Sequence, residues 1–159
     1  RFKIYDIETF MTDLESLLKA NLNTYIAEMN SDKATPDLEN ISDSAYYIQT
    51  LNDAHVNYDD FVFIFEDGVS TVSTGQDNSE TYTVIACVVS NFGNEQERYA
   101  HKRMFRYREI LKRIMQDKRD SIGRPADIRV SSLSPFGVSL LNQSKPQMGI
   151  GISLEVSFA

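Results

Sequence analysis

Residues 148–158 read Met-Gly-Ile-Gly-Ile-Ser-Leu-Glu-Val-Ser-Phe, with an apolar side chain at every second position. Successive side chains of a strand point to opposite faces of its sheet. This alternation therefore predicts a strand that places one face on an apolar core and the other on solvent or on a partner. A sheet containing this C-terminal strand is the first element of the fold that the sequence indicates.

Three further strands are predicted upstream. Residues 61–65 (Phe-Val-Phe-Ile-Phe) form a dense apolar run, typical of a strand that is buried on both faces. Residues 80–90 read as a second strand, antiparallel to the first, and residues 127–133 as a short third one. The small, polar residues 68–79 between the first two strands predict a long hairpin loop or arm.

Two long helices are also predicted. Apolar residues recur every three or four positions over residues 7–29, and Asp6 stands where an N-cap is expected. A second helix is predicted over residues 95–118, with an apolar stripe at Ala100, Met104, Tyr107, Leu111 and Ile114.

The expected fold class is α+β. The order helix, strand, strand, helix, strand, strand predicts a mainly antiparallel four-stranded sheet with both long helices on one face. We expect residues 37–58 to form a short helix or an irregular segment against the core, and residues 134–147 to form a loop. The chain has 159 residues, of which 42% are hydrophobic, so we expect a single globular domain over residues 1–159. No apolar run approaches the length of a membrane span.

Charge is unevenly distributed along the chain. The formal net charge is −7, yet residues 1–97 hold four basic against 18 acidic residues and residues 98–159 hold 12 basic against five acidic ones. An overall acidic protein is repelled by nucleic acid unless its basic residues gather on one surface. Halves of opposite sign can attract each other inside one fold or between copies of it.

Few residues suggest chemistry. His55 lies among acidic residues that include Asp59, but such Asp- and Asn-rich segments are typical of solvated loops. Residues 77–80 offer oxygen ligands without a calcium-loop pattern. Cys87 lies in an apolar strand and His101 among cations. The chain contains no GxSxG, GxxxxGK[ST], GxGxxG or HExxH motif. We therefore expect no enzymatic activity, no cofactor and no metal site.

The second helix is strongly basic: nine of the 16 basic residues of the chain fall within residues 98–119. Such a helix could bind nucleic acid, lie on an anionic membrane, or pair its charged face with acids of a neighbouring subunit. The acidic remainder of the chain favours subunit packing or plain solvation. Our candidate interface residues on this helix and in the predicted arm are Arg98, Lys102, Arg103, Arg106, Lys112, Arg113, Ser73, Gly75 and Asp77.

The whole pattern resembles the tail terminator, or tail completion, proteins of tailed bacteriophages. The matching parts are the helix at 7–29, the hairpin of 61–65 with 81–89, the helix containing residues 103–111 (Arg-Met-Phe-Arg-Tyr-Arg-Glu-Ile-Leu), and the final strand at 149–158. The resemblance is architectural and spans nearly the full chain, but residues 37–58 and 134–147 have no counterpart in it.

This resemblance implies a virion protein that is assembled in the host cytoplasm. It implies a homo-oligomeric ring, commonly a hexamer, that caps the tail tube, joins it to the head or neck proteins, and lets DNA pass through its channel without specific binding. A heterologous ring needs two different, complementary patches on each subunit, and the oppositely charged halves are compatible with that need. The alternatives are another phage neck, connector or baseplate subunit, or a small metal-dependent hydrolase or nuclease that uses His55 and Asp59.

Overall fold

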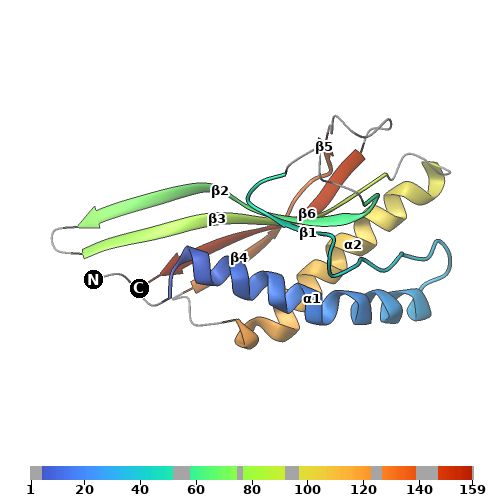
Figure 1. The fold of residues 1–159 in the computed structure, drawn as a ribbon, viewed down its shortest axis with the longest axis horizontal. Coiled ribbons are helices and arrows are strands. Elements are labelled where there is room, and N and C mark those ends of the chain that lie inside the picture. Colours follow the sequence, from blue (N-terminus) through green and yellow to red (C-terminus); the bar gives the residue numbers. More distant parts are fainter. Residues whose placement is uncertain are drawn as a thin grey trace.

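The structure is a computed structural model that describes residues 5–51, 58–74, 77–91, 97–122, 127–138 and 147–158. It is an α+β fold in which helices α1 (Ile7–Asp32) and α2 (Glu97–Lys118) lie on one face of a six-stranded sheet (Figure 1). A short 3-10 helix, η3 (Arg119–Ser121), follows α2 directly. The predicted class and the two long helices are confirmed.

The sheet is mixed rather than antiparallel throughout. Its strand order is β1-β2-β3-β6-β4, and β5 pairs with β6 beside this path. All neighbours are antiparallel except β1 and β2, which are parallel. The strands are β1 (Tyr46–Ile48), β2 (Phe61–Thr74), β3 (Asp77–Ser90), β4 (Asp127–Ser132), β5 (Phe136–Val138) and β6 (Gln147–Phe158).

The predicted number of four strands was therefore wrong, whereas the sheet is mainly antiparallel, as predicted. The two additional strands, β1 and β5, have three residues each, which is too short for an alternating pattern to be recognised. β1 lies where we expected a short helix or an irregular segment, and β5 where we expected a loop. Strand β1 exists because Tyr46 pairs with Val62, and the Val62 amide donates to the carbonyl of Ala45 at 2.9 Å.

Strand β6 lies between β3 on one side and β4 and β5 on the other, and it has the predicted alternation. Ile152, Leu154 and Val156 are fully buried, whereas the intervening Glu155 is exposed. In the register with β3, these buried residues stand opposite Ala86, Val84 and Tyr82. Together they form the helix-facing layer of the core.

The helices contribute the other half of this core. On α1 the buried stripe is formed by apolar residues that include Phe10, Leu18 and Ile26, and on α2 it includes Tyr107 and Leu111. Burying one such side chain stabilises the fold by about 1.5–3 kcal/mol, so this layer supplies the main driving force for folding. The side chain of Asp6 accepts from the amide of Thr9 at 3.1 Å and caps α1 as predicted.

The segment after α1 is fixed by two asparagines of that helix. Asn23 donates to the Ile41 carbonyl at 2.9 Å and accepts from its amide at 2.8 Å. Asn30 makes the same pair of bonds with Leu38, at 2.8 and 2.7 Å. Each amide side chain thus satisfies both backbone groups of one buried residue, and this holds the irregular segment against the core.

Candidate assembly surfaces

A two-stranded arm projects from the sheet. We use "the arm" for residues 68–74 of β2 and 77–83 of β3, which pair from Gly68–Thr83 to Thr74–Asp77. The partner strand β6 ends where Phe158 faces Glu80, so among the described strands only β2 and β3 continue beyond that point. Figure 1 shows these two strands extending past both helices.

Residues 68–79, for which a long hairpin loop or arm was expected, contain paired strands at 68–74 and 77–79. The β-branched residues of the arm favour extended backbone. Two strands pair through backbone hydrogen bonds, so a largely polar segment can form them without apolar side chains. Ser73 and Asp77 lie in the paired ends, although their side chains are outside the described residues, as is all of Gly75. A shift in register between Glu66 and Gly68 marks a bulge at the base of the arm.

The base of the arm is anchored by Tyr82. Its ring packs edge-on against Phe158 at a centroid distance of 5.6 Å. Its hydroxyl donates to Glu80 Oε2 at 2.5 Å, and this bond, followed by burial and the nearby carboxylates, raises the pKa of Tyr82 to about 12. The base of the arm is therefore held in place by an aromatic contact and a hydrogen bond.

The sheet has an outer edge on β2. Strand β1 covers β2 only from Val62 to Ile64. Gln49 extends this cover slightly: its amide donates to the Ile64 carbonyl at 2.6 Å, and its Oε1 accepts from the Glu66 amide at 2.9 Å. Among the described residues, no strand lies beside residues 67–74 on the side away from β3.

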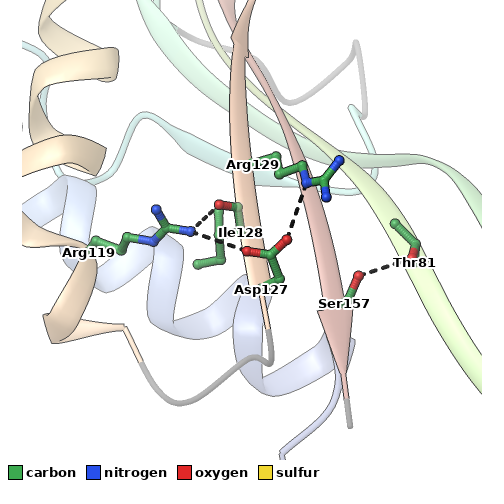
Figure 2. A network of polar contacts seen from close by, with 6 residues as sticks. All are labelled: Thr81, Arg119, Asp127, Ile128, Arg129 and Ser157. Carbon is green, nitrogen blue, oxygen red and sulfur yellow. Dashed lines mark hydrogen bonds and ion pairs between the residues drawn. The ribbon is translucent and has the colours of Figure 1, made fainter.

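The opposite edge of the sheet is β4, which carries a small polar network (Figure 2). Arg119 donates to the Ile128 carbonyl and lies 3.8 Å from Asp127, which also pairs with Arg129 at 3.3 Å. All three charged side chains are about half exposed or more, so their ion pairs stabilise the fold only weakly. The network covers the beginning of β4 and leaves the remainder of its edge exposed.

Exposed apolar side chains lie on these two edges. Within the described residues, the large apolar side chains with high exposure are Val69 at 53%, Phe105 at 48% and Val130 at 39%. Val69 lies on the edge of β2 and Val130 on the edge of β4, whereas Phe105 lies on α2. Single exposed valines are ordinary on protein surfaces, and these two lie on the two open edges of one sheet.

The basic helix is less exposed than its sequence predicts. Arg103 is only 6% exposed, so its assignment to the charged surface of this helix was wrong. It precedes Tyr107 by one helical turn and therefore shares its buried face. Arg106 donates to the carbonyls of Ala34, at 2.8 Å, and Pro36, which makes it a clamp on the segment after α1.

Two further side chains of α2 also donate to backbone carbonyls of other segments. Tyr107 donates to the Glu39 carbonyl at 3.0 Å, and burial raises the pKa of its hydroxyl. Arg108 donates to the Leu133 carbonyl at 2.7 Å. Periodicity could not reveal these roles, because each depends on a carbonyl that the chain brings close only after folding.

Three of the predicted interface residues on α2 are exposed: Lys102, Lys112 and Arg113. Lys112 and Arg113 lie 3.8 and 4.0 Å from the carboxylate of Glu109 on their own helix. The side chain of Arg98 is outside the described residues. The structure thus separates the predicted basic set into exposed residues, the buried Arg103 and the partly buried Arg106.

A hollow of about 370 Å³ lies between the C-terminal halves of α1 and α2. Tyr25 donates across it to Asp117 Oδ2 at 3.0 Å. Acidic and basic side chains of both helices meet there, so the hollow has a mixed charge. Its lining residues are Tyr25, Glu28, Met29, Asp32, Lys33, Glu109, Ile110, Arg113 and Asp117.

The other residues considered for chemistry are placed as follows. Cys87 is buried, its Sγ donates to the Phe63 carbonyl at 3.5 Å, and burial raises the pKa of this thiol to about 12. His101 is exposed on α2, and His55 lies outside the described residues. Asp59 is exposed, and its carbonyl accepts from Gln147 at 3.0 Å. In the part of the chain that the structure describes, no group of three or more His, Cys, Asp or Glu side chains is placed to hold a metal ion.

No protein-family model matches this chain, and no curated protein matches it. Neither α1 nor any other helix within the described ranges is long and apolar enough to cross a membrane.

Proposed function

We propose that this chain is a structural protein of a tailed bacteriophage that assembles into a ring, a hexamer, on the end of the tail tube. The ring joins the tube to the neck proteins, and DNA passes through its channel. In this role the chain acts through the shape and charge of surfaces that meet copies of itself and other proteins, and not by transforming a small molecule.

The arm is the observation that carries this proposal. An isolated two-stranded hairpin is only marginally stable in water, and the outer part of the arm lacks the support of β6. Packing against another subunit or against the tube would stabilise it. A rigid base at Tyr82 and a projecting end suit an element that reaches a neighbour.

The distribution of charge also supports a channel for DNA. Residues 1–97 hold 18 acidic residues against four basic ones. A wall that is rich in carboxylates repels phosphates and lets DNA move without being gripped. The burial of Arg103 and the bonding of Arg106 to backbone carbonyls engage two cations that could otherwise hold DNA.

The experiment is electron microscopy of the purified protein, alone and with tail tubes that lack a terminator. We expect rings with a central channel, and rings seated on tube ends. The test variant shortens the arm by joining residue 70 to residue 81 through a tight turn, and the control carries Gln116→Ala on the exposed face of α2. A protein that forms no ring and does not bind tube ends would overturn the proposal.

The enzyme alternative predicts a different result. If His55 and Asp59 performed hydrolysis, then His55→Ala and Asp59→Ala would abolish metal-dependent turnover of a nuclease or esterase substrate without unfolding the protein. Such turnover by the wild-type protein, lost in both variants, would replace the structural proposal.

A further inference from the structure

We propose that copies of this chain join edge to edge, the outer edge of β2 in one copy pairing antiparallel with the outer edge of β4 in the next. The partner is a second copy of this chain, and the interface is heterologous. This inference deepens the proposed function, on which it rests, because it names the two surfaces that would close the ring.

The first surface has outward-facing backbone groups. The Ile64 carbonyl and the Glu66 amide point away from β3, since both bond to Gln49. In an antiparallel pair, outward-facing residues alternate with residues that bond to the partner strand. Val69 and Thr71 pair with every second residue of β3, counted from the partner of Glu66. They are therefore outward-facing residues, as Glu66 is. Their amides and carbonyls therefore point to the open side.

The second surface, the outer edge of β4, also has outward-facing backbone groups. The Ile128 carbonyl points away from β6, because it accepts from Arg119. By the same alternation, the backbone groups of Val130 and Ser132 point outward as well. Arg119 thus covers only the first outward group of β4, and the groups that follow are open to a partner strand.

The two edges have the strand direction and the position that pairing requires. Three successive antiparallel pairings, β2–β3, β3–β6 and β6–β4, make β4 antiparallel to β2. They also lie level along the sheet: Glu66 faces Val84, Val84 faces Leu154, and Leu154 faces Val130. A neighbour rotated about an axis along the strands therefore brings its β2 beside β4 with little sliding. Repeating this step generates a closed ring when the rotation is a whole fraction of a turn.

The exposed valines match across this contact. Val69 stands opposite Tyr82, and Val130 stands opposite Leu154, so both side chains lie on the helix-facing side of the sheet. Pairing of the edges would place the two valines on one face of the joined sheet. When the edges pair level, Val69 lies two residues away from the position opposite Val130. Cross-strand pairs of β-branched residues stabilise sheets, and this contact would remove both from water.

The charges beside the two edges have opposite signs. Glu66 and the exposed Asp67 lie at the start of the free part of β2. Arg129, whose side chain is 78% exposed, and Arg119 flank Asp127 on β4. An acidic edge that meets an edge with excess positive charge favours pairing of unlike edges over pairing of two identical ones.

The experiment measures self-association of the full chain by sedimentation velocity and native mass spectrometry. Val69→Lys and Val130→Lys each place a charge on one edge, a change that discourages strand pairing. We expect each to weaken association by about tenfold or more. Phe105→Lys, which alters the third exposed apolar residue without touching an edge, should leave association unchanged. Because all three side chains are exposed, circular dichroism should show native folding in each variant.

Mixing the two edge variants gives the sharpest result. The Val69→Lys protein retains a normal β4 edge, and the Val130→Lys protein retains a normal β2 edge. An equimolar mixture should therefore form one-to-one heterodimers and nothing larger. Normal oligomers formed by either variant, a heterodimer that does not form, or a monomeric wild-type protein at every concentration would each overturn edge pairing. Rings that persist in both variants, or rings formed on tube ends by a protein that is monomeric in solution, would still leave the proposed function standing.

Discussion

Among the glycines that the structure describes, Gly151 should be the most damaging to replace by alanine. Gly151 lies in β6 opposite Cys87 of β3. A Cβ atom there would meet the Ala86 carbonyl oxygen well inside van der Waals contact and would lie 2.6 Å from the Cα of Cys87. These are backbone atoms of a central strand, so no side chain can rotate away. Strands β3 and β6 would have to separate locally.

The magnitude follows from that separation. Restoring ordinary contact requires a displacement of about 1 Å, which lengthens the neighbouring interstrand hydrogen bonds beyond useful range. Loss of two or three such bonds, at about 1 kcal/mol each, together with overpacking of about 1–3 kcal/mol, predicts a loss of about 3–5 kcal/mol in the free energy of unfolding. For a domain of this size, the melting temperature should fall by about 6–20 °C.

The assay is urea denaturation followed by circular dichroism, with Gly149→Ala as the matched control. The three atoms nearest to a Cβ at Gly149 all belong to the ring of Phe136, the closest at 2.5 Å, and that side chain can move. We expect the control to lose about 1 kcal/mol. If Gly151→Ala costs no more than Gly149→Ala, then β6 does not approach β3 as closely as described and the reasoning fails.

Three further predictions concern polar groups. Asn23→Ala leaves both backbone groups of Ile41 without their partner and should lower the free energy of unfolding by about 2–4 kcal/mol in urea denaturation; a change below about 0.5 kcal/mol would contradict this. Arg106→Gln should destabilise the fold by about 1–3 kcal/mol, whereas Lys112→Gln should change stability by less than about 0.5 kcal/mol; equal melting temperatures would refute the clamp. Because the pKa of Tyr82 is raised to about 12, its contribution to stability is fully present below pH 10.0 and is lost as the pH rises through about 12. Tyr82→Phe should remove that part of the alkaline loss of stability, measured by thermal melts across this range, and an unchanged pH profile would contradict the assignment.

The long amphipathic and alternating segments were predictable from the sequence. The stripe from Phe10 to Ile26 and the alternation from Ile150 to Phe158 each repeat over many residues, so the pattern is clear even without knowing the partner surface. The N-cap at Asp6 depends only on a neighbour three residues away. Information that is local and repeated survives in a single sequence.

The assembly surfaces were only partly predictable. The sequence located the segment of the arm and the exposed Lys112 and Arg113, but it also placed Arg103 on the surface of α2. It gave no indication that Val69 and Val130 occupy the two open edges of one sheet. Which strand lies at an edge is a property of the strand order, and that order is settled by contacts between distant segments.

From the sequence alone came the α+β class, the two long helices, the C-terminal strand and the unequal charge of the two halves. Their physical origin is local: side-chain periodicity, capping and composition act within a few residues. Only the tertiary structure decided that β1 runs parallel to β2, that Arg103 and Arg106 turn inward, and that two edges remain open. Each of these depends on backbone hydrogen-bonding groups that meet only when segments far apart in the chain have packed together.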